Sequence, residues 1–299
     1  MKIVTTTLTC VLFFVTLSCA QNKHTKFNED ELLNRLEILS SDKFEGRKTG
    51  EIGNDLARNY IIEQFKSFNL TGLYGKFEHP FSFELNGQKF SANNILVDIK
   101  GTEFPEEYIV ISAHHDHLGI FGNKIYNGAD DDASGVAALI SFAEYFTKNP
   151  PKHSVILAAF DAEELGLRGA RHFIANFDNT KILLNLNMDM ISRSANDELY
   201  VVGTRYNKKL KTAIDGFSNS TSSKLLQGHD GLDGKQNWTM SSDHGPFYTA
   251  KIPFLYFGNE DHPAYHKPTD DFADITPQFY KNSVNVILSI FETIDVLEL

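Results

Sequence analysis

The sequence has few cysteines and no excess of basic residues. Its two cysteines, Cys10 and Cys19, both lie close to the N-terminus of the 299-residue chain. Residues 20–299 therefore offer neither a disulfide nor a thiolate metal ligand, so the fold depends on a hydrophobic core that a chain of this length can bury. The formal net charge is −11, without a basic run. Such a chain is a poor candidate for binding nucleic acid or an anionic membrane surface.

The N-terminal segment differs in kind from the rest of the chain. Lys2 is followed by the apolar run IVTTTLTCVLFFVTLSCAQ, which is too short and too rich in threonine for a membrane span and is typical of a secretory signal. Its ending LSC resembles a bacterial lipobox in which Cys19 carries the lipid, although Thr16 stands where leucine is usual. We expect residues 1–18 to be a signal peptide and residues 19–26 a tether. The expected product is an exported lipoprotein, anchored to a membrane in the periplasm or at the cell surface, or otherwise a secreted protein.

Residues 27–299 show the pattern of a single α/β domain, with no repeat or low-complexity tract. Continuous apolar runs indicate buried strands at 108–114, 153–160 and 182–191, and helical patterns at 134–146 and 165–177 alternate with them. Strands that alternate with helices predict a mixed, largely parallel central sheet covered by helices on both faces. A short strand in IPFLYF and a terminal helix from about residue 276 to residue 297 complete this pattern.

Two helices and a hairpin are expected before the first of these strands. The leucines of residues 27–42 have helical spacing, and the segment FEHPFSFELNGQKF predicts a hairpin with its turn at Asn86–Gly87. The segment 50–70 predicts a second helix whose apolar side is formed by Ile52, Leu56, Ile61 and Phe65.

Residue types that bind metals stand at the end of each buried strand. The first run leads into AHHDH (113–117), the second into DAEEL (161–165), and the third contains Asp189. In open α/β sheets, sites form outside the carboxyl ends of the strands. The stretch NGADDDASG (127–135) adds three adjacent carboxylates before a helix. Alone it would indicate an acidic helix start, but beside these strand ends it favours a cation site.

Alternation along a strand divides the AHHDH motif into two pairs. His114 and Asp116 would face one side and His115 and His117 the other, and either pair could serve a metal. If His114 binds the ion, Asp116 can orient its imidazole from behind. In DAEEL, one carboxylate can bind a metal while its neighbour stays free as a general base.

Together these motifs resemble a known family. The motifs SAHHDH, NGADDDASG, FDAEELGLRGA, NMDM and YHKPTD, in this order between residues 112 and 270, are similar to those of the exported di-zinc aminopeptidases. The wider family includes glutamate carboxypeptidase and the glutaminyl cyclases. Because LEILSSDKFEGRKTG also resembles bacterial members, the resemblance covers nearly the whole chain after the expected signal peptide.

The resemblance implies a zinc peptidase catalytic domain over residues 27–299 that holds two zinc ions. It assigns His114, Asp131 and Asp189 to one ion, and Asp131, Glu164 and His266 to the other, so that Asp131 bridges both. Nitrogen and carboxylate ligands suit zinc, with manganese or cobalt as substitutes.

The resemblance also assigns roles to residues around the ions. It makes Glu163 the general base, Asp116 the carboxylate partner of His114, and Tyr265 the hydroxyl that stabilises the oxyanion. It further suggests a cis peptide between Asp131 and Asp132. The flanking Asp130 and Asp132 receive no role from it and are interpreted as helix-start residues.

The implied activity is removal of N-terminal residues from peptide substrates. A water activated by the two ions would give its proton to Glu163, which would deliver it to the leaving amine. Met190 and Phe247 are candidates for lining an apolar pocket for the first residue of the substrate.

Three alternatives remain open. A glutaminyl cyclase would use one zinc ion in a similar site. A carboxypeptidase would need basic residues such as Arg193 or Arg205 to bind the substrate's carboxylates. A non-catalytic ectodomain would have lost ligands or the base, whereas all of them are present here, which favours the two-metal aminopeptidase.

Overall fold

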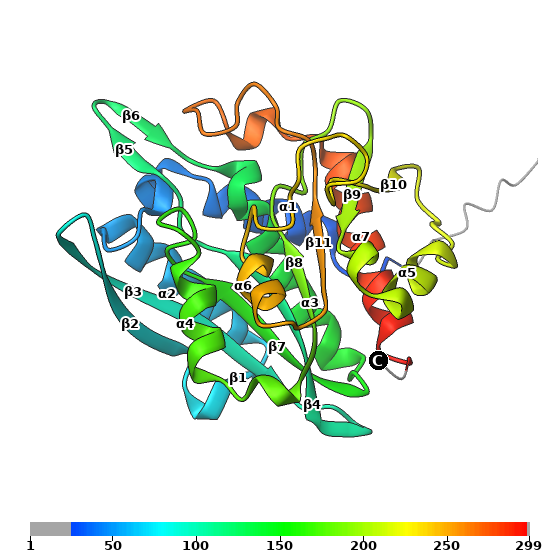
Figure 1. The fold of residues 1–299 in the computed structure, drawn as a ribbon. Helices are drawn as coiled ribbons and strands as arrows, with labels where there is room; N and C mark the ends of the chain where they lie inside the picture. Colours follow the sequence, from blue (N-terminus) through cyan, green and yellow to red (C-terminus); the bar gives the residue numbers. More distant parts are fainter. Residues whose placement is uncertain (1–24, 298–299) are drawn as a thin grey trace, which may run out of the picture.

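The computed structural model describes residues 25–297 and places one central sheet between layers of helices (Figure 1). The expected signal peptide at 1–18, Cys19 and the tether up to residue 24 lie outside the described residues. Between residues 25 and 297, no helix is both long and apolar enough to cross a membrane.

The centre of the sheet is parallel. Strand β4 (Phe104–His114) pairs in parallel with β7 (His153–Phe160) on one side and with β8 (Ile182–Met188) on the other. Strand β8 in turn pairs in parallel with β11 (Phe254–Gly258). The predicted α/β architecture with a mixed sheet is therefore confirmed, and the strand in IPFLYF is β11.

The outer strands make the sheet mixed. Its order in the described part of the chain is β1-β3-β7-β4-β8-β11-β9-β10, with β2 also paired to β3. Antiparallel pairs join β3 (Gln88–Ile99) to β7 and β9 (Glu198–Val202) to β11. The remaining strands are β1 (Thr71–Gly72), β2 (Glu78–Leu85), β10 (Lys224–Gln227), and the separate hairpin of β5 (Gly119–Phe121) and β6 (Lys124–Tyr126).

Side-chain alternation along the central strands builds a core on each face of the sheet. In β4, Ile109 and Ile111 pack into the core under one set of helices, whereas Tyr108 and Val110 pack into the core on the opposite face. The first core includes residues of α1 (Glu29–Leu39), α2 (Ile52–Ser67), α3 (Ser134–Lys148), α5 (Lys208–Asp215) and α7 (Pro277–Ile294). The second includes residues of α4 (Arg168–Asn176) and α6 (His244–Thr249).

The N-terminal elements agree with the predictions except for one face of a helix. The turn of the β2–β3 hairpin is at Asn86–Gly87, and both residues have the positive φ of a type I′ turn. In α2, however, Ile61 and Phe65 are buried while Ile52 and Leu56 are 70% and 38% exposed. The predicted apolar side was wrong because Ile61 lies nine positions after Ile52, about two and a half helical turns, which puts the two pairs on opposite faces.

Candidate metal centre

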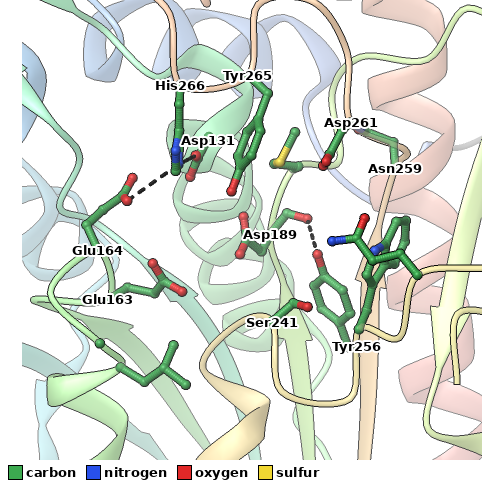
Figure 2. Close-up of a pocket in the computed structure, with 15 residues that line it drawn as sticks. Asp131, Glu163, Glu164, Asp189, Ser241, Tyr256, Asn259, Asp261, Tyr265 and His266 are labelled. Carbon is green, nitrogen blue, oxygen red and sulfur yellow. Dashed lines mark hydrogen bonds and ion pairs between the residues drawn. The ribbon is translucent and has the colours of Figure 1, made fainter. Parts of the chain in front are cut away.

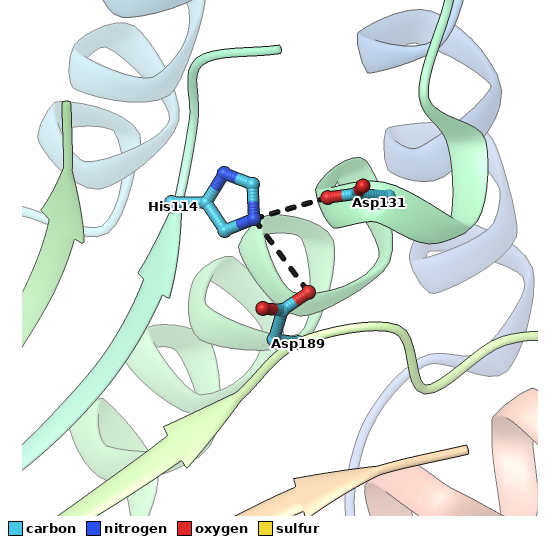
Figure 3. A group of neighbouring side chains, drawn as sticks. All are labelled: His114, Asp131 and Asp189. Carbon is cyan, nitrogen blue, oxygen red and sulfur yellow. Dashed lines mark ion pairs between the residues drawn. The ribbon is translucent and has the colours of Figure 1, made fainter. Parts of the chain in front are cut away.

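The carboxyl ends of the parallel strands bring the first three predicted ligands together. His114 is the last residue of β4, Asp189 follows β8, and Asp131 lies in the turn that leads into α3. The Nε2 atom of His114 is 3.1 Å from Oδ1 of Asp131 and 3.6 Å from Oδ1 of Asp189 (Figure 3). The Nδ1 atom of His114 donates to the carbonyl of Asp116, which leaves Nε2 free to bind a cation.

A second group of donors lies on the other side of Asp131. Glu164 follows β7, and His266 lies in the loop after β11. The Nε2 atom of His266 is 3.1 Å from Oδ2 of Asp131 and 3.4 Å from Oε2 of Glu164 (Figure 2). His117 also belongs here, because its Nδ1 atom is 2.8 Å from Oε1 of Glu164. Each oxygen of Asp131 thus faces its own set of donors. Asp131 is also common to the two groups whose donor atoms lie close enough together to hold an ion, which are His114, Asp131 and Asp189, and His117, Asp131 and Glu164.

The donor atoms have the chemistry and the unsatisfied state expected of metal ligands. Within residues 25–297, Nε2 of His114, Oε1 of Glu164 and Oδ1 of Asp189 are buried without a hydrogen-bond partner. A buried polar atom without a partner costs about 1–3 kcal/mol, and a bound cation would remove that cost. The imidazole and carboxylate donors fit zinc.

A cavity of about 370 Å³ opens beside these donors. Its lining includes Met190 as well as Glu163 and Tyr265, which Figure 2 labels. Glu163 is next to Glu164 in sequence but belongs to neither metal-binding group. Burial raises the pKa of Glu163 well above its usual range, opposed by His114 and reinforced by Asp189. Burial thus favours the protonated form of this carboxyl group.

The two candidates for the apolar part of the pocket have different places. Met190 lines the cavity, as proposed from the sequence. Phe247 is fully buried in the core between the sheet and α4, where it packs against Phe160 and Phe173. Phe247 is therefore a core residue, because its position in α6 turns it toward the sheet.

Tyr265 lies against the last predicted ligand. Its ring stacks on that of His266 with 3.9 Å between centroids, and its hydroxyl points into the cavity (Figure 2). Burial raises the pKa of Tyr265, and the charges of Asp131 and Asp189 add to this effect. The hydroxyl therefore stays protonated near neutral pH and can donate a hydrogen bond.

The Asp116 carboxylate is directed mainly at backbone amides. Its Oδ1 atom accepts a hydrogen bond from the backbone N–H of Glu163 at 3.0 Å, and Oδ2 accepts from that of Glu164 at 3.3 Å. Oδ1 is 3.7 Å from Nδ1 of His114, farther than the 3.0 Å separating that nitrogen from the Asp116 carbonyl. Asp116 thus fixes the segment that carries Glu163 and Glu164, and its main chain orients His114.

The acidic neighbours of Asp131 hold the surrounding loops. Asp132 accepts hydrogen bonds from the backbone N–H of His114 and from that of Gly135 in the first turn of α3, in agreement with a helix-start residue. The peptide between Asp131 and Asp132 is cis, as the resemblance suggested.

Asp130 has a different role from the one predicted. Its Oδ1 atom accepts from the backbone N–H and the hydroxyl of Ser192, and its Oδ2 atom contacts Asn259 and His262. It therefore joins the loops after β8 and β11 and does not cap α3, since these partners are distant in sequence.

Arg47 is a fully buried cation beneath the turn that carries Asp131. Its guanidinium donates to the backbone carbonyls of Leu39, His115, Asn127 and Gly128. Burial lowers the pKa of Arg47, and the nearby carboxylates, with Asp131 first, oppose that shift. Four main-chain acceptors in three segments make Arg47 a brace for the site. Neither its spacing nor its neighbours in sequence signal this role.

The two arginines considered for binding a substrate carboxylate do not contribute to the cavity. No lysine or arginine is among the described residues that line it. Arg205 donates instead to the carbonyl of Asp230, away from the donors. Arg193 and Arg205, the two candidates for binding a substrate carboxylate, are therefore outside this cavity.

Comparison with known sequences places the chain among metallopeptidases. Residues 94–291, which are most of the chain and contain every predicted site residue, match Peptidase family M28. The chain is 29% identical over 188 residues to "Aminopeptidase YwaD" of Bacillus subtilis, an alignment that covers 58% of this chain and 38% of that protein. It is 28% identical over 207 residues to a "Probable zinc metalloprotease" of Phaeosphaeria nodorum, covering 60% and 41%. The chain thus spans about two fifths of the length of these curated relatives.

Solved structures share the fold at low sequence identity. An aminopeptidase from Aneurinibacillus sp. strain AM-1 superposes with a TM-score of 0.71 at 16% identity, covering 89% of this chain and 93% of that one. The glutaminyl cyclase of Porphyromonas gingivalis superposes with a TM-score of 0.70 at 16% identity, covering 89% and 98%. The fold is therefore common to enzymes of both kinds, while the sequence match shows that the chain belongs to Peptidase family M28.

Proposed function

We propose that this protein is a metal-dependent aminopeptidase that removes N-terminal residues from peptides with two bridged zinc ions and Glu163 as general base. The observation that carries the proposal is the position of Asp131, whose two oxygens face separate donor groups. A carboxylate shared in this way suits a pair of ions better than a single one. The donors of one ion would be His114, Asp131 and Asp189, and those of the other would include Asp131, Glu164 and His266.

The reaction assigns distinct tasks to the chain's own groups. When bound, the two ions would supply Lewis-acid chemistry by polarising the scissile carbonyl and acidifying a water. Glu163 accepts the proton of the attacking water and delivers it to the leaving amine. The Tyr265 hydroxyl donates a hydrogen bond to the oxygen on which negative charge develops. Asp116 keeps Glu163 in place through its backbone N–H.

The charge of the cavity favours the amino end of a peptide over its carboxyl end. In addition to the donors and Glu163, the carboxylate of Asp261 lines the cavity, and the described lining contains no lysine or arginine. Because two bound zinc ions would offset the charge of their ligands, Asp261 is the carboxylate of the described lining that stays available to pair with a free α-ammonium group, whereas no lysine or arginine of that lining can pair with a C-terminal carboxylate. The volume of about 370 Å³ is at the small end of ligand sites, which suits the end of a chain.

The proposed place of action is outside the cytoplasm. This proposal is supported by the apolar N-terminal run and the LSC ending at Cys19. Peptides that reach the periplasm or the cell surface would then be the substrates.

The experiment compares three substrate classes with zinc-loaded protein: aminoacyl p-nitroanilides with a free amino group, the same compounds after N-acetylation, and N-terminal glutaminyl peptides. We expect hydrolysis of the free aminoacyl compounds, loss of turnover after acetylation, and no ammonia release from the glutaminyl peptides. Cyclisation of glutaminyl peptides without aminoacyl hydrolysis would support the cyclase alternative and refute the proposal.

A further inference from the structure

His117 is a buried histidine to which the family resemblance gives no task. Its side chain is about 1% exposed. Neither ring nitrogen has a hydrogen-bond partner within the described part of the chain. An unpartnered buried imidazole is costly, and a bound cation would offset that cost.

Comparison with the neighbouring histidine shows that the lack of hydrogen-bond partners is specific to His117. His115 is equally buried, but its Nε2 atom contacts the carbonyl of Asn93 at 3.2 Å and its Nδ1 atom lies 3.5 Å from Nδ2 of Asn54. His115 is therefore satisfied by the protein, whereas His117 is not.

The geometry directs His117 at the second donor group. Its Nδ1 atom is 2.8 Å from Oε1 of Glu164 and 3.8 Å from Oδ2 of Asp131. Nδ1 and Oε1 are within ion-pair distance but lack the angle of a hydrogen bond, so neither atom has a hydrogen-bond partner among residues 25–297. Two ligands of one metal ion have this arrangement, because their donor atoms lie close together without a hydrogen bond between them.

The first donor group shows the same arrangement. Nε2 of His114 and Oδ1 of Asp189 lie 3.6 Å apart, and both are buried and unpartnered in the described chain. These two residues are expected ligands of the other ion. Because His117 and Glu164 repeat this signature on the opposite side of Asp131, the same interpretation applies to them.

Close packing holds the His117 ring in this position. Gly128 has a left-handed backbone with a φ of 56° and lies against the ring, since a Cβ atom at Gly128 would be 2.5 Å from Cδ2 of His117. Arg47 fixes this backbone segment by donating to the Gly128 carbonyl at 2.9 Å. The ring is thus positioned before any ion binds.

We propose that His117 is a sixth protein ligand, which binds through Nδ1 the ion that Asp131, Glu164 and His266 also bind. The inference rests on the proposed function only in requiring metal beside Asp131. The two sites would then be unequal. Four protein donors would surround one ion, whereas the other would have three, from His114, Asp131 and Asp189. Zinc with four protein ligands is usually closed, whereas three ligands leave a position open. The site beside His114 would then be the one that takes atoms of the substrate.

The test measures metal affinity and does not depend on turnover. Zinc is titrated into metal-free wild type, His117→Asn and the matched control His115→Asn in the presence of a competing chelator, with circular dichroism as the check of folding. We expect two ions in the wild type, and at least about tenfold weaker binding of one of them in His117→Asn, as for removal of a group that supports a zinc site. His115→Asn should keep both affinities. Wild-type affinities for both ions in folded His117→Asn would overturn the proposal.

A second measurement uses the unmodified protein and therefore does not depend on the folding of a variant. X-ray absorption at the zinc edge counts imidazoles through their scattering pattern. The proposal predicts three imidazoles for each pair of zinc ions, from His114, His117 and His266, and two imidazoles would overturn it. A wild type that binds no zinc would instead refute the proposed function together with this assignment.

Discussion

Replacement of Glu163 by glutamine should distinguish the role of general base from that of metal ligand. Glutamine keeps the size of the side chain but cannot take up a proton. Glu163 lines the cavity, belongs to neither metal-binding group, and receives its support through its backbone N–H, which the substitution leaves intact. Zinc content and the fold should therefore be retained. Turnover should fall by roughly 10²–10⁴, the usual contribution of a positioned general base, which corresponds to about 3–5 kcal/mol in the activation barrier.

The assay measures kcat and KM for an aminoacyl p-nitroanilide together with the zinc content of the same preparation. The loss should appear mainly in kcat, because proton transfer matters in the transition state and little in the ground-state complex. Glu164→Gln is the matched control one residue away. It should lose zinc first and activity as a consequence, with partial recovery at high zinc concentration. A near wild-type kcat for Glu163→Gln, or loss of zinc from Glu163→Gln but not from Glu164→Gln, would refute the assignment.

Three further predictions concern stability and processing. Arg47→Lys should lower the free energy of unfolding by at least about 2 kcal/mol in urea titrations, because it leaves buried carbonyls unpaired, and an unchanged value would contradict the bracing role. Burial of His244 lowers its pKa from 6.5 to about 4. The free energy of unfolding should therefore be highest above pH 6.5 and should fall by up to about 3 kcal/mol as the pH falls toward 4, because the unfolded chain takes up the proton first. With a chelator present, unfolding of His244→Phe should depend less on pH over this range than unfolding of the wild type, and parallel curves would refute this. Mass spectrometry of the native N-terminus should find a lipid on Cys19, whereas a chain that begins at Met1 or beyond Cys19 without lipid would contradict the anchor.

The sequence allowed prediction of the parts of the fold that follow from local pattern. Apolar runs gave β4, β7 and β8, and the polar residues at their ends met because the carboxyl ends of neighbouring parallel strands lie at one edge of a sheet. The positions of His114, Asp131, Glu164, Asp189 and His266 around one another follow from this rule together with the family's motifs. Their roles remain predictions until metal and turnover are measured.

His117 shows where strand alternation stops being informative. Alternation placed it on the side opposite to His114, but β4 ends at His114, so the rule does not apply to the next three residues. The chain after the strand turns so that His117 faces Glu164 and Asp131. The AHHDH motif left open which pair of side chains serves a metal, and it did not single out His117.

Other features depend on contacts between distant segments. Asp130 bonds to Ser192 and Asn259, and Arg47 to the carbonyls of Asn127 and Gly128. No local periodicity encodes such contacts, because they exist only once the loops after different strands have come together. A single sequence can therefore indicate the ligands of a site more readily than the residues that hold the ligands in place.

Asp131 is proposed to bridge two metal ions. The most direct test is a crystal structure of the zinc-loaded wild type with anomalous scattering recorded at the zinc edge, accompanied by elemental analysis of the same protein. We expect two zinc ions per chain, one on the side of His114 and Asp189 and the other on the side of Glu164 and His266, each contacting one oxygen of Asp131. A single ion per chain at zinc saturation would contradict it.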